Sequence, residues 1–371
     1  MLNFIKKIFE KKQKYTPLPL VSEGGFWNEI KKPIMCMAPM ADVTDAPFRQ
    51  MFAKYGRPDI TWTEFVSADG LFLRPIVPGV SDQSTNEFER IALEHGVGTD
   101  HPLLKDLIYT EAERPIVAQF FSKDPERMER AARLTAALGY DGFDINMGCP
   151  AKVICNQGAG SAMINDPEGA QELIQAAIRG AEFNGKKIPV SVKTRIGYNK
   201  NEIDTWLPAL LAANPVAVIL HARTRKEMSK VPAKWEIIKH AVEMRDELGS
   251  NILILGNGDV DSLREADQRV VETGCDGVMI GRGIFGNPWF FNREVKKEDL
   301  SEKEILKTLL EHTQLFDEIL SNTKSFSIMK KHCKSYIAGL PDIKSLRTEL
   351  MEKGNDYKDV ENIVEHHLQE P

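Results

Sequence analysis

The sequence predicts an α/β fold, a (β/α)8 TIM barrel followed by a C-terminal all-helical domain. Short apolar, β-branched runs recur between residues 34 and 281, and helical patterns lie between many of them. After residue 295 only helical patterns follow. The alternating part spans about 250 residues, the usual length of such a barrel. A doubly wound open sheet is the alternative, but no GxGxxG motif follows the first expected strand, which disfavours the dinucleotide-binding version of that fold.

The expected strands are short apolar segments. Several are almost continuously hydrophobic, which is typical of a parallel strand buried on both faces. They comprise residues 34–38, 60–66, 115–120, 142–146, 189–193, 216–221, 251–257 and 276–281.

The segments between these strands carry helix signals. Residues 126–139, 235–249 and 261–274 have helical spacing and each ends on a glycine, the usual residue just past a helix C-terminus. Residues 166–183 open with Asp166 before a proline, an N-terminal cap signal. In the tail, residues 299–322 and 325–338 are expected to be helical, and 345–368 hold one or two more helices.

Three regions are expected on this pattern. Residues 1–30 form a basic N-terminal extension whose first segment reads as a solvated terminal helix, and residues 31–294 form the barrel. An insertion at 67–114 separates the second and third strands, far more than a βα loop needs. We expect it on the C-terminal face of the barrel, where it covers the mouth or adds substrate contacts. Residues 295–371 form the helical domain.

Composition excludes several classes of protein. The net charge of −6 rules out a globally basic, histone-like nucleic-acid binder but leaves room for a local basic patch. Five cysteines without a CxxC pair argue against a zinc site and against disulfides, and point to a reducing, cytoplasmic compartment. No apolar run reaches about 18 residues, so no membrane-spanning helix is expected.

Polar side chains gather at the ends of the expected strands. In a barrel the C-terminal strand ends and the loops after them build the active site. Each such residue alone is more often a solvated loop residue, but ionisable groups are costly to bury unpaired, so a converging ring indicates a shared site. The ring comprises Pro39 with Met40, Glu64, Gln119, Asn146 with Cys149, Lys193 with Arg195, His221 with Arg223, Asn257, and Gly281 with Arg282.

The last two strands are followed by glycine-rich turns, residues 255–260 and 280–288. Barrels often bind a phosphate there with backbone N–H groups, and Arg282 is placed to add a charged fork. Glycine-rich turns are common, so it is the pair of turns together with the arginine that indicates phosphate.

Six motifs in order carry a family resemblance: APMADVTDAPFR (38–49), NMGCPAKV with GAGSAMI (146–164), VKTRIG (192–197), LHART (220–224), GNGDV (256–260) and IGRGIFGNPW (280–289). Together they resemble the tRNA-dihydrouridine synthases over roughly residues 33–292, and MKKHCKSYIAG (329–339) resembles the C-terminal helical motif of that family.

The resemblance implies a flavin enzyme that reduces a specific tRNA uridine to 5,6-dihydrouridine. NADPH, or alternatively NADH, would reduce bound FMN, and hydride would pass from flavin N5 to uracil C6. Cys149 would then protonate C5 as the general acid. The implied cofactor-binding residues are Pro39, Met40, Gln119, Asn146, Lys193, His221, Asn257, Gly258, Gly281 and Arg282. Arg195 and Arg223 are implied to face the tRNA or the flavin.

The residue types suit this chemistry. A thiol with a pKa near ~8.5 is largely protonated at neutral pH and can supply a proton. A lysine near the flavin N1–O2 edge would stabilise the negative charge of the reduced ring. Gly148 and Pro150 flank Cys149 just after a strand, which favours an exposed turn over the buried position usual for a free cysteine. For Cys155 we expect a structural and not a catalytic role. No metal site is expected at His95 and His101.

The charge is uneven along the chain, which bears on the partner. Residues 323–348 carry six basic side chains against Asp342 alone. Lys330, Lys331 and Lys334 in this stretch are therefore the candidates for gripping tRNA, and a monomer without an obligate protein partner is expected. Two alternatives stay open: an FMN barrel that acts on a small molecule such as dihydroorotate or an enone, and a non-catalytic RNA-binding or chaperone protein that kept the fold.

Overall fold

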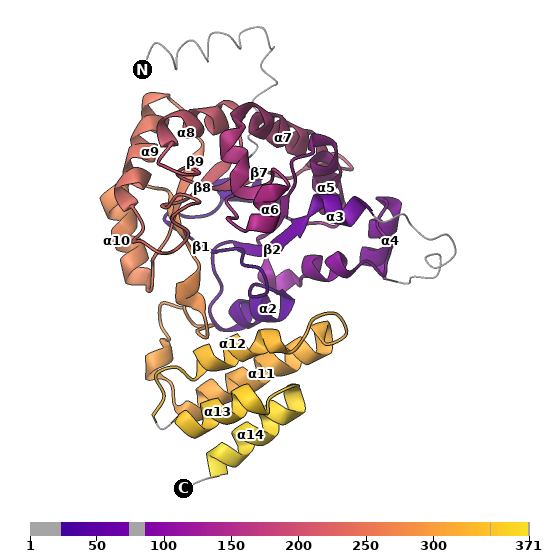
Figure 1. The fold of residues 1–371 in the computed structure, drawn as a ribbon, viewed down its shortest axis with the longest axis vertical. Helices are drawn as coiled ribbons and strands as arrows, with labels where there is room; N and C mark the ends of the chain where they lie inside the picture. The colour runs from indigo at the N-terminus through magenta and orange to yellow at the C-terminus, as the bar shows by residue number, and fades with distance from the viewer. Residues whose placement is uncertain (1–23, 74–85, 342, 370–371) are drawn as a thin grey trace.

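The computed structural model describes residues 24–73, 86–341 and 343–369. Eight parallel strands form its centre (Figure 1). They are β1 (Ile34–Met37), β2 (Thr61–Ser67), β3 (Ile116–Phe121), β4 (Gly142–Met147), β7 (Val190–Arg195), β8 (Ala217–His221), β9 (Leu253–Asn257) and β10 (Gly277–Ile280). Each expected strand is present, with ends that differ by one or two residues.

The sheet closes on itself. Its strand order is β1-β10-β9-β8-β7-β4-β3-β2, and every neighbouring pair is parallel. The two ends meet where the Met37 amide donates to the Ile60 carbonyl at 3.3 Å, and Cys36 forms a parallel bridge with Ile60. The predicted fold class, a TIM barrel followed by helices, is therefore confirmed.

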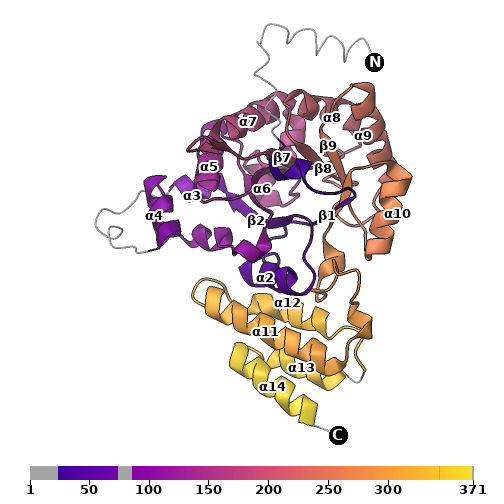
Figure 2. The same ribbon diagram turned by 180° about the vertical axis from the view of Figure 1, so that it is seen from behind.

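Helices surround this barrel (Figures 1 and 2). They are α2 (Ala46–Tyr55), α5 (Pro125–Ala137), α6 (Lys152–Asn156), α7 (Pro167–Gly180), α8 (Ile203–Ala212), α9 (Trp235–Glu247) and α10 (Leu263–Thr273). The expected cap is present at Asp166, whose carboxylate accepts from the Gly169 amide at 3.0 Å. Gly274 ends α10 with a φ of 71°, a left-handed conformation that favours glycine.

The barrel interior is layered. At the N-terminal end lie apolar side chains, closed from below by the buried Trp27 of η1 (Gly25–Asn28). Above them is a polar layer in which Gln119, Asp144 and Ser191 occupy neighbouring register positions of β3, β4 and β7. All three are buried, so their polar atoms must find partners inside the barrel.

A short antiparallel hairpin was not expected. Strands β5 (Glu182–Phe183) and β6 (Lys186–Lys187) pair across Asn184 and Gly185, which have φ angles of 50° and 77°. Two consecutive positive φ angles are typical of a type I′ turn, and Asn-Gly is the usual sequence for it. The Asn184-Gly185 dipeptide was therefore the sequence signal that could have predicted this hairpin.

The described part of the insertion packs beside the barrel. It contains α3 (Ala68–Leu73), α4 (Glu87–Glu94), η2 (Pro102–Leu107) and η3 (Glu111–Glu113), while residues 74–85 lie outside the described residues. Helix α4 is capped by Asn86, whose side-chain oxygen accepts from the Phe88 amide at 2.9 Å. The fully buried ion pair of Arg49 in α2 with Glu113 in η3, at 2.7 Å, fixes the insertion to the barrel.

Four helices follow the barrel and pack below it in Figure 1: α11 (Glu302–Leu320), α12 (Ser327–Tyr336), α13 (Lys344–Glu352) and α14 (Tyr357–Gln369). Residues 345–368 thus hold essentially two helices. The basic N-terminal segment, with its expected terminal helix, lies outside the described residues. None of the helices in the described ranges is long and apolar enough to cross a membrane.

The interface between the barrel and these helices is part aromatic and part ionic. His312 of α11 and His332 of α12 pack against Phe48 of α2, with ring centroids 5.8 and 5.2 Å from it. Lys324, in the loop between α11 and α12, forms ion pairs with Glu64 of β2 at 2.6 Å and with Asp106 of η2 at 2.8 Å. The ion pairs connect the helical region directly to β2 of the barrel and to η2 of the insertion.

Candidate active site

A cavity of about 650 Å³ opens at the C-terminal ends of the strands. This volume is typical of a cofactor or small-ligand site. Most of the predicted site residues line it together: Pro39, Met40, Asn146, Cys149, Lys193, Arg195, His221, Arg223, Asn257, Gly258, Gly281 and Arg282. Gln119 lies below the cavity and is not among its lining residues. None of the described residues of the insertion is among its lining residues.

Cys149 lies on the loop that leaves β4. Its backbone N–H and that of Gly148 both donate to the Asn146 side-chain oxygen, at 2.8 and 3.1 Å. Burial raises the pKa of the Cys149 thiol above its usual range, so it is protonated at neutral pH. Cys155 is not among the lining residues of the cavity, and its sulfur lies 3.6 Å from the Cys149 carbonyl oxygen and 3.3 Å from the Ser161 hydroxyl.

Lys193 brings an ammonium group to the cavity. Its Nζ donates to Asn257 Oδ1 at 3.0 Å, and Asn257 is held in turn by donating to the Met279 carbonyl at 2.7 Å. Burial, and then the neighbouring Arg195, lower the pKa of Lys193 to about 8. Its direct partner is a neutral amide, so the site favours a ligand with negative charge at this position.

Arg195 has a different environment from the one expected. The resemblance implied that it faces tRNA or flavin, and it does line the cavity. Its guanidinium, however, donates to the backbone carbonyls of Gly148 at 2.8 Å, Thr224 at 3.3 Å and Met228 at 3.1 Å. Arg195 therefore joins the loop of Cys149 to the loop that follows β8.

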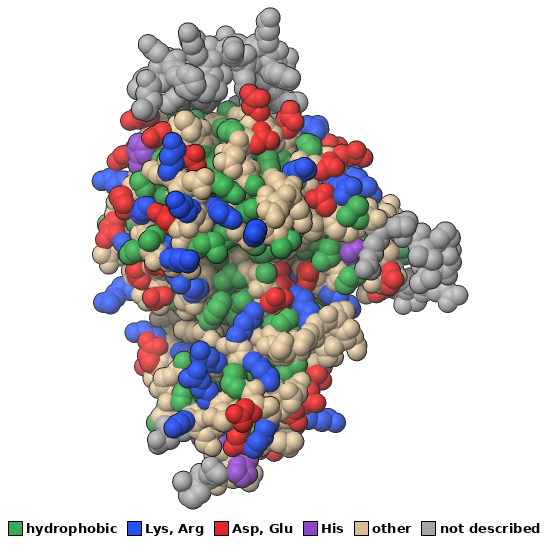
Figure 3. All heavy atoms as spheres, viewed as in Figure 1, with side chains coloured by type: hydrophobic (Ala, Val, Ile, Leu, Met, Phe, Trp, Pro, Cys, Tyr) green, Lys and Arg blue, Asp and Glu red, His purple; other side chains and the backbone are tan. Residues whose placement is uncertain are grey.

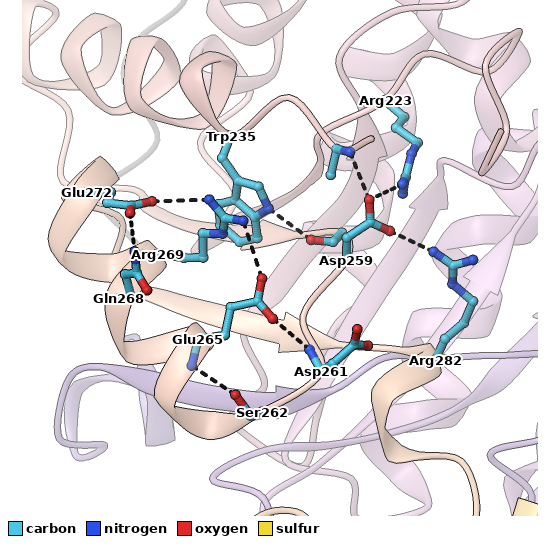
Figure 4. A network of polar contacts seen from close by, with 12 residues as sticks. Arg223, Trp235, Asp259, Asp261, Ser262, Glu265, Gln268, Arg269, Glu272 and Arg282 are labelled. Atoms are coloured by element: carbon cyan, nitrogen blue, oxygen red, sulfur yellow. Dashed lines mark hydrogen bonds and ion pairs between the residues drawn. The ribbon is translucent and has the colours of Figure 1, made fainter. Parts of the chain in front are cut away.

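The far corner of the cavity contains a shared carboxylate (Figure 4). Asp259 accepts from Arg223, from Arg282 at 2.6 Å and from the Ala233 amide at 2.9 Å. Arg223 also donates to His221 Nε2 at 3.2 Å, and burial together with the nearby cations lowers the pKa of His221 well below its usual range. Asp261 lines the same corner, so the two arginines face two carboxylates. Lys193 and Arg195 add two cations elsewhere in the lining, so the cavity as a whole keeps a net positive charge.

The glycine turns leave backbone exposed in this corner. A Cβ atom added at Gly281 would meet nothing closer than Met40 Sδ at 3.7 Å, so its backbone is open towards the cavity. Gly258 has a φ of 132°, a conformation that L residues rarely adopt. Open backbone in a cavity of net positive charge fits a phosphate, and the Lys193 ammonium fits the electron-rich edge of a flavin. The cavity thus has features that suit FMN.

Sequence reasoning missed two carboxylates. Asp259 belongs to the first of the two glycine-rich turns, residues 255–260, and an acidic residue in a proposed phosphate turn was the signal. Asp144 is buried in the middle of β4, where a carboxylate within an otherwise apolar strand was the signal. Both orient neighbouring site residues.

The three lysines expected to grip tRNA lie on α12 in different environments. Lys330 donates to the Met351 carbonyl at 2.8 Å, and Lys331 is half-buried, with Asp42, Asp45 and Glu64 nearby. Lys334 is exposed. Figure 3 shows Lys and Arg side chains on both sides of the hollow between the barrel and the C-terminal helices.

His95 and His101 take part in the packing of the insertion. His95 Nδ1 lies 2.9 Å from the Ile91 carbonyl, and its ring packs on Phe183. His101 accepts from the Leu103 amide at 3.2 Å. Within the described ranges, no three His, Cys, Asp or Glu side chains come together as a metal site.

A family model described as dihydrouridine synthase (Dus) matches residues 36–370. The chain belongs to the dihydrouridine synthase family. It is therefore an enzyme of a flavin-dependent family, as its motifs predicted. The match covers the barrel and nearly all of the C-terminal helices.

Several relatives of this Dus-family chain are named. A probable tRNA-dihydrouridine synthase of Staphylococcus aureus (strain COL) is 35% identical over 329 residues, which are 88% of this chain and 91% of that protein. The probable tRNA-dihydrouridine synthase 2 of Bacillus subtilis (strain 168) is 36% identical over 334 residues, with 88% and 92% covered.

Solved structures show a more distant likeness. Morphinone reductase aligns with a TM-score of 0.44 and 13% identity over 70% of this chain and 84% of that chain. The old yellow enzyme homologue from Zymomonas mobilis aligns with a TM-score of 0.43 and 13% identity over 72% and 91%.

Proposed function

We propose that this chain reduces a specific uridine of tRNA to 5,6-dihydrouridine, with FMN as bound cofactor and NADPH as reductant. The observation that carries the proposal is the pairing of a protonated thiol, Cys149, with a half-buried ammonium, Lys193, around one cavity in a member of the Dus family. The names of the relatives support tRNA as the substrate.

When bound, the reduced flavin supplies a hydride from N5 to C6 of the uracil. The proton for C5 comes from the Cys149 thiol, whose S–H bond breaks as the C5–H bond forms. Burial raises the pKa of this thiol, which keeps the proton in place until negative charge develops at C5. The loop amides on Asn146 fix the position of the thiol.

The remaining site residues would hold the flavin cofactor and orient it. Lys193 and Asn257 would meet the flavin ring, and the positive charge of Lys193 would stabilise the negative charge that the ring gains on reduction. Gly258, Gly281 and Arg282 would hold the phosphate. Arg282 is exposed, so its guanidinium can leave Asp259 for a phosphate oxygen.

The test of the proposal replaces the acid. Cys149→Ala should keep its flavin and its NADPH oxidation but lose tRNA reduction by at least ~100-fold, a typical contribution of a general acid. Dihydrouridine is measured by mass spectrometry of digested tRNA. Cys155→Ala is the matched control, because it removes a second thiol of the same loop region and should keep full activity.

Two results would contradict the proposal. If Cys149→Ala still reduced tRNA at the parent rate, Cys149 would not be the acid. If the parent protein bound flavin and oxidised NADPH but left every tRNA uridine unchanged, the substrate would instead be a small molecule.

A further inference from the structure

The side-chain amide of Asn146 has a defined orientation. Its Oδ1 must face the two backbone N–H donors of Gly148 and Cys149, because only the oxygen can accept from them. Its Nδ2 therefore points the other way and donates to Gln119 Oε1 at 2.9 Å. The second hydrogen of Nδ2 is left for an acceptor in the cavity, which Asn146 lines.

The amide of Gln119 is oriented in the same way. Since its Oε1 accepts from Asn146, its Nε2 faces the opposite side and donates to the Asp144 carboxylate at 2.5 Å. The other oxygen of Asp144 accepts from the Ser191 hydroxyl at 2.5 Å. Gln119, Asp144 and Ser191 are almost fully buried, so water does not supply alternative partners for them.

Asp144 is the fixed end of this chain of hydrogen bonds. An ionised carboxylate only accepts, so Gln119 must present its N–H group to it and its oxygen to Asn146. A reversed Gln119 would place its oxygen against a carboxylate oxygen and its N–H against the N–H of Asn146. Two unfavourable contacts in a buried site cost far more than the reversal gains.

We propose that Asp144 is a positioning residue for the proton donor: through Gln119 it orients the Asn146 amide, which holds the Cys149 loop and presents an N–H group to the cavity. This inference rests on the proposed function for its catalytic consequence. Its structural part, the order of the loop amides, can be measured without turnover.

The experiment compares two replacements of Asp144 in the flavin-loaded protein. Asp144→Asn keeps an acceptor oxygen for Gln119 and places its own NH₂ on the Ser191 hydroxyl, which then donates to the Phe143 carbonyl, 3.5 Å away. Asp144→Leu keeps the branching and the number of side-chain heavy atoms, although its methyl groups are larger than oxygens, and it offers no acceptor. Ile34→Ala is the control, because it destabilises the barrel interior at the opposite end, where Ile34 is fully buried.

Two measurements separate positioning from folding. In Asp144→Leu we expect kcat for tRNA reduction, expressed per bound flavin, to fall about 100-fold, the cost of a small misplacement of a reacting group, with KM for tRNA unchanged. We also expect faster hydrogen–deuterium exchange of the amides in residues 147–151. Asp144→Asn should match the parent in both, and Ile34→Ala should keep the parent kcat although its melting temperature falls.

Three outcomes would overturn the inference. They are a parent-like kcat and exchange rate in Asp144→Leu, an equal loss in Asp144→Asn, or an equal loss of kcat in Ile34→Ala. If the parent itself fails to reduce tRNA, the proposed function is contradicted. The hydrogen–deuterium exchange of residues 147–151 in the two Asp144 variants then decides by itself whether Asp144 orders the Cys149 loop.

Discussion

Lys193 is a residue whose charge changes near physiological pH. Burial and Arg195 lower its pKa to about 8, so it is cationic below that pH and neutral above it. The cation is the form that stabilises negative charge on a reduced flavin. We therefore expect the rate of flavin reduction by NADPH to fall as the pH rises through about 8, measured by the loss of flavin absorbance in a stopped-flow instrument.

The variants for this test are Lys193→Met and Lys200→Met. The first should be slow and should lack the pH dependence between 7 and 9, because it has no amine to titrate. The second removes an exposed lysine a few residues further along the chain and should keep the parent profile. A Lys193→Met profile that still falls through pH 8 would assign the dependence to another group.

Which residues line the site was predictable from the sequence, but their hydrogen bonds were not. The strand-end rule places His221 or Asn257 at the cavity, because every parallel strand ends on the same side. The rule does not predict hydrogen-bond partners, because these depend on how neighbouring strands are aligned. Gln119, Asp144 and Ser191 meet because three strands align at that level, and Arg195 turns to backbone carbonyls of loops that the sequence does not place.

At the scale of elements, the loop between α11 and α12 is held against the barrel by a partly buried ion pair. Burial and Asp106 raise the pKa of Glu64 to about 7, and Lys324 opposes that rise. Lys324→Met would leave two carboxyl groups without their cation. We expect it to lower the free energy of unfolding by about 2 kcal/mol, the usual worth of hydrogen bonds to charged groups, measured by urea denaturation.

The matched control removes an ion pair that joins the barrel to the same helices but lies at the protein surface. Lys54 of α2 pairs with Glu311 of α11 at 2.6 Å, but the lysine side chain is 56% exposed against 15% for Lys324. Lys54→Met should therefore change the free energy of unfolding by less than about 1 kcal/mol. Equal losses in the two variants would mean that burial does not strengthen the Lys324 pair.

Elements were predictable where their own sequence carries the signal. Apolar runs marked the eight barrel strands because burial on both faces requires them. The β5–β6 hairpin escaped because its strands have two residues each and are mostly exposed, so the Asn-Gly turn is their only mark. The contacts between the insertion and α2 depend on Glu113 meeting Arg49, a pair 64 residues apart that no local pattern reveals.

For the whole molecule, the net charge of −6 is a poor guide to its partner. Phosphate binding depends on cations gathered on one face, because screening limits the reach of each charge to about 10 Å. The hollow between the barrel and the C-terminal helices has Lys and Arg side chains on both sides (Figure 3). Of the three lysines proposed to grip tRNA, Lys334 is the exposed one. Lys330 donates to the Met351 carbonyl, and Lys331 is half-buried with carboxylates nearby.

The salt dependence of tRNA binding tests this assignment. If Lys334 contacts a phosphate, Lys334→Met should weaken binding and reduce the slope of log K against log salt concentration by about 1, because one fewer counterion is released. Lys358→Met makes the same charge change on α14, on the far side of the C-terminal helices from the barrel (Figure 1), and should leave the slope unchanged. Filter binding between 50 and 200 mM salt, the range in which phosphate contacts change affinity steeply, measures both. An equal drop for the two variants would show that the protein attracts tRNA by overall charge, and an unchanged slope for Lys334→Met would remove this lysine from the tRNA interface.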